Sequence, residues 1–168
     1  MKKVKILNNL FSQEENNKIL FELCNTSWFI AFESTPRQEQ LFVFKKHLGF
    51  SLISNERNNN EDIILNNFAN KVTEKVLSKL NIKGKISRFM WNHYLSNQNS
   101  SVHTDHNQDN FISILYNLHT TDGGTEIDKK FYPDKVSQAK VFKSNLLHRG
   151  IGPKKDVVRF NLNIVIET

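Results

Sequence analysis

The hydrophobic pattern of this chain changes at Gly84, and that change constrains the fold more than any other feature of the sequence. Before Gly84, apolar residues recur every three or four positions, which is the period of a helix with one buried face. After it, short segments alternate between apolar and polar residues, as strands do, and turn sequences separate them. Helices followed by a run of strands predict an α+β fold, which we expect to form a single domain over residues 1–168.

Two helices are predicted in the first part of the chain, over residues 12–25 and 61–80. Ser12 and Glu15 are three residues apart and predict a capping box at the start of the first helix. Asn60 is placed to cap the second helix. A stripe of apolar residues predicts that one face of the second helix is buried, and it consists of Ile64, Leu65, Phe68, Val72, Val76 and Leu80.

Strands are predicted over residues 41–44, 85–95, 111–118, 125–132, 140–142 and 157–166. The last of these has two different faces. We expect its apolar face to pack on the helices. Its polar face either looks into the protein, where a bound polar ligand would accompany it, or meets water. The apolar face contains Val158, Phe160, Leu162, Ile164 and Ile166, and the other contains Arg159, Asn161, Asn163 and Val165.

A candidate metal site begins at His103-Thr104-Asp105. In an extended segment, residues two apart point to the same side, so one imidazole and one carboxylate can meet the same ion. His148 is the candidate third ligand. Two histidines and one carboxylate on one face of an octahedron leave positions open for other ligands, as in non-heme Fe(II) oxygenases. The same three groups also suit zinc.

Arg159 follows His148 by eleven positions, across the turn sequence at residues 150–153. We expect a hairpin to place Arg159 on the strand beside His148. The planar guanidinium pairs with a carboxylate through two parallel hydrogen bonds. Arg159 is therefore predicted to bind the far carboxylate of a co-substrate that chelates the metal.

These motifs, in this order and spacing, resemble the 2-oxoglutarate/Fe(II)-dependent dioxygenase superfamily and, within it, the prolyl-4-hydroxylase-like branch. They are His103-x-Asp105, Gly123-Gly124-Thr125-Glu126, His148 and Arg159. The resemblance implies a double-stranded β-helix (jelly roll) with supporting N-terminal helices. It implies Fe(II) held by His103, Asp105 and His148, with 2-oxoglutarate and O2 as co-substrates.

The resemblance also implies roles for residues around the co-substrate. Arg159 would bind the C5 carboxylate of 2-oxoglutarate. A tyrosine on an earlier strand often joins it in the family, and Tyr94 fits that place. Asn92, on the same strand face as Tyr94, and Asn161 are further candidates for binding the co-substrate.

The sequence departs from its relatives at two places. Residues 95–101 lack the glycine that prolyl hydroxylases usually have before the His-x-Asp motif. Val165 occupies the position of a second arginine in nucleic-acid demethylases, which argues against that branch. Because Asp105 is present, hydroxylation is expected rather than halogenation.

Neighbouring polar residues have simpler interpretations. His106 is expected to point away from Asp105 and to lie at the rim of the site. Glu126 is expected to pair with a nearby backbone group or lysine, and Arg149 to face away from the metal. His93 is expected to point opposite to Tyr94.

The sequence thus predicts an oxygenase that hydroxylates an unactivated C–H bond, first of a peptide or protein side chain, with release of succinate and CO2. A small metabolite or free amino acid is the alternative substrate. A non-catalytic jelly-roll module that binds metal or a small acid, and a zinc hydrolase, are alternatives of other classes.

Composition limits the partners and the location. The net charge is +6, but the lysines are scattered, so no nucleic-acid partner is expected. No segment is apolar enough to span a bilayer or to act as a secretory signal. The one cysteine, Cys24, leaves no internal disulfide, and a cytoplasmic location is expected. The oligomeric state is open.

Overall fold

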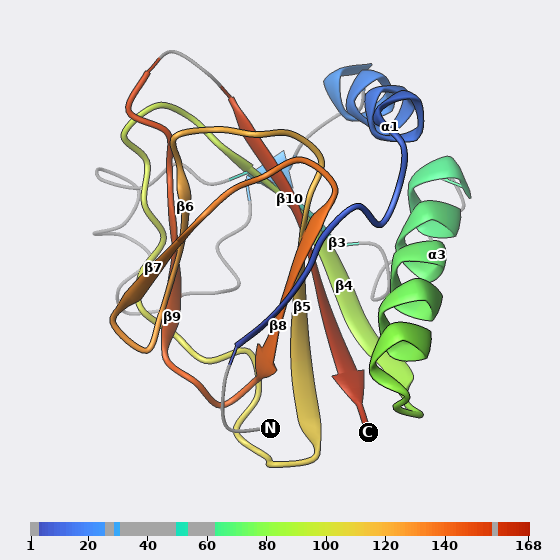
Figure 1. Ribbon diagram of the computed structural model, residues 1–168. Coiled ribbons are helices and arrows are strands. Elements are labelled where there is room, and N and C mark those ends of the chain that lie inside the picture. Colours follow the sequence, from blue (N-terminus) through green and yellow to red (C-terminus); the bar gives the residue numbers. More distant parts are fainter. Residues whose placement is uncertain (1–3, 26–28, 31–49, 54–62, 156–157) are drawn as a thin grey trace.

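The structure is a computed structural model that describes residues 4–25, 29–30, 50–53, 63–155 and 158–168. Its described strands form two antiparallel sheets, and its two described helices lie together against the larger sheet (Figure 1). This arrangement confirms the predicted α+β class. The predicted strand at residues 41–44 and the cap at Asn60 lie outside the described residues.

The larger sheet has seven strands, and the smaller has three. The order in the larger sheet is β1 (Lys5–Leu7), β8 (Gln138–Lys143), β5 (Phe111–Asn117), β10 (Arg159–Glu167), β4 (Lys85–Tyr94), β3 (Phe50–Ile53) and β2 (Phe29–Ile30). The order in the smaller sheet is β7 (Lys130–Pro133), β6 (Gly124–Ile127) and β9 (His148–Ile151).

Helix α1 (Gln13–Asn25) begins at the predicted capping box. The backbone N–H of Glu15 donates to Ser12 Oγ at 3.2 Å, and the N–H of Ser12 donates to Glu15 Oε2 at 2.8 Å. These two bonds satisfy backbone donors that the first helical turn leaves unpaired. The buried Asn16 side chain then accepts a 2.6 Å hydrogen bond from the Tyr116 hydroxyl, which ties α1 to β5.

Helix α3 (Ile63–Leu80) packs most of its predicted apolar stripe on the larger sheet, but Ile64, which was predicted to belong to the buried face, is 53% exposed. Phe68 lies at the centre of this contact, with its ring centroid 6.4 Å from that of Trp91 and 5.7 Å from that of Tyr116. The alternation of β10 continues this core. Phe160, Leu162, Ile164 and Ile166 are buried in the same cluster as the helices, as predicted.

The opposite face of the larger sheet meets the smaller sheet. Leu115 of β5, Phe142 of β8 and Ile127 of β6 form a small buried cluster between them. The polar side chains of β10 also face this interior, and Arg159, Asn161 and Asn163 are at most 4% exposed. The interpretation in which this face meets water is therefore wrong.

Two strand predictions need correction. Residues 125–132 form two strands, β6 and β7, rather than one, because Asp128 and Lys129 both have positive φ (48° and 64°) and turn the chain back. Left-handed conformations at residues other than glycine leave no clear signal in the sequence. The expected hairpin between His148 and Arg159 is also absent: β9 pairs with β6 in the smaller sheet, whereas β10 lies in the larger sheet.

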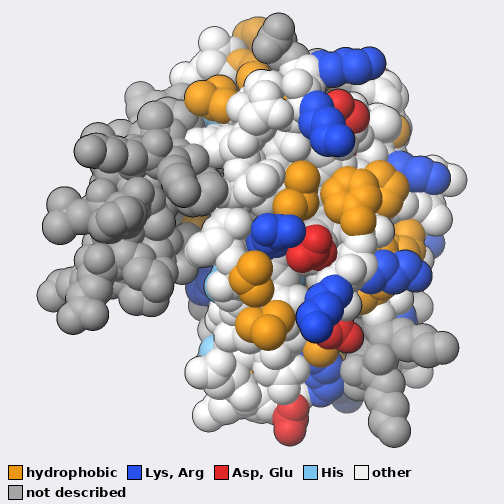
Figure 2. All heavy atoms as spheres, turned by 90° about the vertical axis from the view of Figure 1, so that its left-hand side faces the viewer, with side chains coloured by type: hydrophobic (Ala, Val, Ile, Leu, Met, Phe, Trp, Pro, Cys, Tyr) orange, Lys and Arg blue, Asp and Glu red, His pale blue; other side chains and the backbone are white. Residues whose placement is uncertain are grey.

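Charge on the surface is mixed. Figure 2 shows the side of the molecule that faces left in Figure 1, and on it Lys and Arg side chains are interspersed with acidic and hydrophobic ones. The basic residues in the described part of the chain therefore form no continuous area on this face. No helix among the described residues is long and apolar enough to cross a membrane.

Candidate metal and co-substrate site

His103 and His148 approach each other through an isolated antiparallel bridge. His103 lies in the connection between β4 and β5, and His148 is the first residue of β9. Each backbone N–H donates to the carbonyl of the other residue at 2.9 Å. The main chain thereby fixes the positions from which the two rings project.

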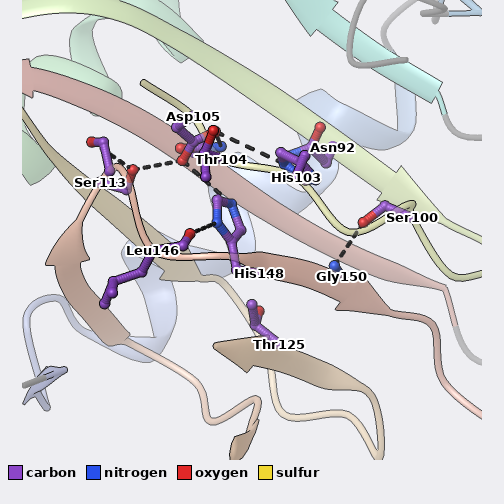
Figure 3. Close-up of polar contacts among 12 residues, drawn as sticks. Asn92, Ser100, His103, Thr104, Asp105, Ser113, Thr125, Leu146, His148 and Gly150 are labelled. Atoms are coloured by element: carbon purple, nitrogen blue, oxygen red, sulfur yellow. Dashed lines mark hydrogen bonds and ion pairs between the residues drawn. The ribbon is translucent and has the colours of Figure 1, made fainter. Parts of the chain in front are cut away.

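Both imidazoles are oriented through their Nδ1 atoms. His103 Nδ1 is 2.9 Å from the carbonyl of Ser101. His148 Nδ1 is 2.9 Å from the carbonyl of Leu146, a contact that Figure 3 shows. A carbonyl oxygen can only accept, so Nδ1 of each ring carries the proton. Each Nε2 then presents a lone pair, which is the arrangement of metal-binding histidines.

Asp105 completes a group of three ligands. Its Oδ2 atom is 3.4 Å from His148 Nε2, and its Oδ1 atom is 4.0 Å from His103 Nε2. One ligand atom from each of the three residues lies within 4.8 Å of the other two. The predicted metal ligands are thus brought together.

The environment of His148 fits a bound metal ion. Its Nε2 atom is buried and has no hydrogen-bond partner among the described residues. A buried acceptor without a partner costs free energy, and a metal ion at this point would satisfy it. Burial lowers the pKa of His148, with Asp105 acting in the opposite direction, and so favours the neutral ring that a metal requires.

Strands of the larger sheet hold the Asp105 carboxylate. Its Oδ1 atom accepts from Arg88 Nη2 on β4 at 2.9 Å and from Asn163 Nδ2 on β10 at 3.0 Å. Its Oδ2 atom accepts from Ser113 Oγ on β5 at 2.5 Å. Burial alone would raise the pKa of Asp105, but the positive charge beside it, to which Arg88 contributes, and the Ser113 hydroxyl hold it below its usual value. The carboxylate is therefore ionised and fixed in direction.

Sequence reasoning did not assign Arg88, Ser113 or Asn163 to the site. Asn163 is on the same face of β10 as Arg159, so its orientation was available from the alternation alone. Arg88 shares a face of β4 with Asn92 and Tyr94 in the same way. Ser113 had no comparable signal, because its contact depends on how the loop before β5 folds back.

Arg159 lies at the start of β10 and is fully buried. Its Nε atom donates to Asp134 Oδ2 at 2.5 Å, and its Nη2 atom donates to Thr125 Oγ1 at 3.1 Å. Its Nη1 atom is buried and has no partner among the described residues. One end of the guanidinium therefore remains available to a ligand.

The other predicted co-substrate residues surround Arg159. Tyr94 stands opposite it in the β4–β10 register, and the guanidinium carbon lies 4.6 Å from the centre of the Tyr94 ring. Asn92 and Asn161 are likewise opposite each other, and Asn92 Nδ2 donates to Asn161 Oδ1 at 3.0 Å. All four side chains thus lie on the two adjacent strands as expected.

Glycines make room for these side chains. A Cβ on Gly150 would lie 2.3 Å from the Tyr94 hydroxyl, so a larger residue there would displace the ring. A Cβ on Gly123 would lie 2.8 Å from the carbonyl of Ile151 and 3.2 Å from Arg159 Cδ. The Gly-Gly motif therefore permits close approach of β6, β9 and the arginine side chain.

The residues given simpler interpretations are outside the ligand group. His106 stacks on Phe111 with ring centroids 3.6 Å apart. Glu126 pairs with Arg149 at 3.2 Å, away from the metal ligands. His93 packs against Phe160, with ring centroids 4.8 Å apart, on the helix side of the sheet.

Comparison with solved structures identifies the fold. Over 98% of its length, the chain superposes on 76% of SnoN, a non-heme α-ketoglutarate-dependent epimerase from nogalamycin biosynthesis, with a TM-score of 0.71 and 8% identity. It also matches 97% of a viral collagen prolyl hydroxylase from Paramecium bursaria Chlorella virus-1, over 99% of its own length, with a TM-score of 0.64 and 15% identity. A prolyl-4-hydroxylase from Pseudomonas putida matches over 98% of this chain and 92% of its own, with a TM-score of 0.66 and 10% identity.

The chain therefore shares the fold of an α-ketoglutarate-dependent epimerase and of two prolyl hydroxylases, in agreement with the resemblance found in the sequence. The neighbours include prolyl hydroxylases, which is the predicted branch. No family model matches the chain. No curated protein matches it in sequence.

Proposed function

We propose that this chain is an Fe(II)- and 2-oxoglutarate-dependent oxygenase, built as a single domain on a double-stranded β-helix. His103, Asp105 and His148 would hold the iron. Arg159 would bind the C5 carboxylate of 2-oxoglutarate, with Tyr94, Asn92 and Asn161 beside it. The iron and its co-substrates supply O2 activation, in which 2-oxoglutarate is decarboxylated to succinate and CO2 and a C–H bond becomes hydroxylated.

One observation carries this proposal: two buried atoms, His148 Nε2 and Arg159 Nη1, have no hydrogen-bond partner among the described residues. The lone pair of His148 Nε2 can bind a metal cation, and the N–H groups of Arg159 Nη1 can donate to a carboxylate. A molecule that chelates a metal at one end and has a carboxylate at the other satisfies both. 2-Oxoglutarate is such a molecule, and solved structures of this fold contain it, including HygX with nickel and the viral prolyl hydroxylase.

The chain itself supplies orientation. Arg88, Ser113 and Asn163 hold the Asp105 carboxylate from three strands, so its direction does not depend on the metal. The backbone bridge does the same for the two histidines. Such pre-arrangement lowers the cost of assembling the centre when iron and co-substrate bind.

The substrate of first choice is a peptide or protein side chain. This choice follows the similarity to prolyl hydroxylases, one of which was solved with a peptide of hypoxia inducible factor. A small molecule is the second choice, because SnoN acts in nogalamycin biosynthesis and shares the fold. Mass spectrometry after incubation with a prolyl-peptide library and with a metabolite extract separates these, since each reports which component gains an oxygen atom.

Succinate formation tests the reaction class without knowledge of the substrate. The protein is loaded with Fe(II) under anaerobic conditions, mixed with 2-oxoglutarate and exposed to O2. Wild type is expected to form succinate slowly in the absence of substrate, and Asp105→Ala is expected to form none. Asp109→Ala removes an exposed carboxylate four positions away and should behave as wild type.

Binding experiments separate the alternatives. A non-catalytic module would bind metal or 2-oxoglutarate but form no succinate even with the substrate libraries. A zinc hydrolase would be active with zinc and indifferent to 2-oxoglutarate and O2. Failure of the wild type to bind Fe(II) and 2-oxoglutarate together would remove the oxygenase proposal.

A further inference from the structure

Arg159 belongs to a buried cluster that contains more positive than negative charge. Lys140 of β8 and Arg159 are both 0% exposed, and Asp134, directly after β7, is 2% exposed. Asp134 bridges the two cations, because its Oδ1 atom accepts from Lys140 Nζ at 2.6 Å and its Oδ2 atom accepts from Arg159 Nε at 2.5 Å. Two cations share one carboxylate among the described residues, so the cluster has a net charge of +1.

Neutral neighbours complete the cluster but do not balance it. Asn117, in the amide orientation that satisfies both neighbours, donates to Asp134 Oδ1 at 3.1 Å and accepts from Lys140 Nζ at 2.8 Å. Thr125 Oγ1 accepts from Arg159. A buried net charge is costly unless an ion of opposite sign joins it. The partnerless Nη1 atom of Arg159 marks where such an anion can bind.

Lys140 controls how much of Asp134 is available to Arg159. An arginine and a carboxylate pair most strongly through two parallel hydrogen bonds. Here the two contacts differ in length. Arg159 Nε is 2.5 Å from Asp134 Oδ2, whereas Arg159 Nη2 is 3.5 Å from Asp134 Oδ1, the oxygen that accepts from Lys140 Nζ. Without Lys140, Oδ1 would keep only the neutral Asn117 amide as a donor and could complete the two-bond pair with Arg159, which would have no net charge.

We infer that Lys140 is a positioning residue for co-substrate binding. Its ion pair with Asp134 limits the pairing of Asp134 with Arg159, so the guanidinium of Arg159 stays available to an anion and the cluster keeps its net positive charge. Lys140 need not touch the co-substrate. Its effect passes through Asp134, so removing that carboxylate together with Lys140 should release Arg159 again. This inference rests on the proposed function, because it takes the anion to be the C5 carboxylate of 2-oxoglutarate.

The charges on the cluster agree with this arrangement. Burial alone would raise the pKa of Asp134, but Arg159 and Lys140 outweigh burial and hold it below its usual value. Burial lowers the pKa of Lys140, while the Asp134 carboxylate opposes that shift and favours the ammonium form. The short ammonium–carboxylate contact describes an ion pair rather than two neutral groups.

Calorimetric titration of 2-oxoglutarate into Ni(II)-loaded protein tests the inference without turnover. Lys140→Met is expected to weaken 2-oxoglutarate binding by about tenfold or more, which corresponds to about 1.4 kcal/mol. The double variant Asp134→Asn/Lys140→Met is expected to bind within about threefold of wild type, which corresponds to under about 0.7 kcal/mol. Ni(II) stoichiometry should be the same in all variants, because none of the substitutions touches a metal ligand.

A matched control is Lys5→Met. Lys5 is exposed on β1 and stands opposite Val141 of β8, so it changes the net charge equally without entering the cluster. If Lys140→Met does not fold, Lys140→Gln replaces it; glutamine keeps a hydrogen-bond donor for Asp134 but no charge, and a smaller loss is expected.

The outcomes are distinct. Unchanged binding in Lys140→Met would overturn the inference, and so would a loss that the double variant fails to restore, because Lys140 would then act only through packing. If the wild type binds Ni(II) but not 2-oxoglutarate, both the proposed function and the inference about Lys140 are contradicted. If the wild type binds 2-oxoglutarate and Lys140→Met binds it with the same affinity, only the inference about Lys140 is contradicted.

Discussion

The backbones of His103 and His148 exchange two hydrogen bonds of 2.9 Å, although the residues lie in different parts of the chain. The two candidate metal ligands are thus fixed by main-chain pairing rather than by the metal. We expect chelator-treated protein to keep its fold, with unchanged far-ultraviolet circular dichroism, and to regain Fe(II) stoichiometrically. A protein that unfolds on chelation would show that the metal, and not the bridge, holds this region together.

Replacement of Arg159 tests the co-substrate site. Arg159→Ala should raise the dissociation constant for 2-oxoglutarate by at least roughly 30-fold, because losing one partner of a buried charge pair costs about 2–5 kcal/mol. Arg149→Ala is the matched control, since Arg149 pairs with Glu126 and faces away from the ligand group. Equal affinities in Arg159→Ala and wild type would rule out the assigned role.

Gly150 and Tyr94 should behave as a coupled pair. An alanine at position 150 would place its Cβ 2.3 Å from the Tyr94 hydroxyl and force the ring away from Arg159. We expect Gly150→Ala to weaken 2-oxoglutarate binding and to lower stability by about 1–3 kcal/mol, as overpacking does.

A double-mutant cycle in chemical denaturation checks this coupling. Combining Gly150→Ala with Tyr94→Ala removes the clash, so the two stability losses should be less than additive. Strict additivity would show that the glycine and the tyrosine do not compete for the same space.

His119 should make stability depend on pH. Its Nε2 atom accepts the backbone N–H of Phe160 at 3.0 Å, which only an unprotonated nitrogen can do. Burial, opposed by Asp134 and assisted by Arg159, lowers the pKa of His119 in the folded state. The unfolded chain therefore binds more protons below about pH 6.5, and the free energy of unfolding should fall as the pH drops through that value.

Urea denaturation at several pH values measures this dependence. His119→Gln should reduce the slope without abolishing it, because burial also lowers the pKa values of His93 and His148. A slope identical to that of wild type would show that His119 titrates alike in the folded and unfolded states.

Truncation of a buried and of an exposed isoleucine tests the packing of β10 against the helices. Ile164 on β10 is 0% exposed, and Ile64 on α3 is 53% exposed. Ile164→Ala should lower the free energy of unfolding by about 2–5 kcal/mol, because it leaves a cavity between the sheet and the helices. Ile64→Ala should change it by less than about 0.5 kcal/mol. Similar losses at both positions in urea denaturation would contradict the packing described for β10.

Local patterns in the sequence were enough to predict several features. The capping box at Ser12 and Glu15 depends on residues three apart, and the two faces of β10 depend on strand alternation. The same alternation put Arg159 and Asn161 on one face of the last strand, although it left open whether that face is buried, and the His-x-Asp spacing brought His103 and Asp105 to one side. Each of these signals is contained within a few neighbouring residues.

Features that depend on distant pairing were not predictable. Nothing near His148 in the sequence indicates that β9 pairs with β6 rather than with β10. Asp134 and Lys140 read as ordinary charged residues, because their burial depends on Arg159 arriving from another strand. The turn at Asp128 and Lys129 was missed because, although aspartate tolerates positive φ, lysine rarely adopts it, and the Asp-Gly or Asn-Gly pair that usually marks such a turn is absent.

Side chains along β10 alternate between the two faces of the larger sheet, so the face that each residue occupies depends on its position along the strand. Odd-numbered positions from Arg159 to Asn163 belong to the site, and the even-numbered positions between them and beyond belong to the helix interface. Inserting or deleting one residue within this stretch would send arginine and asparagine into the apolar layer and phenylalanine and leucine into the site. Substitutions along β10 can therefore change the site while each side chain keeps its face, whereas insertions and deletions are tolerated only in the connections on either side of the strand.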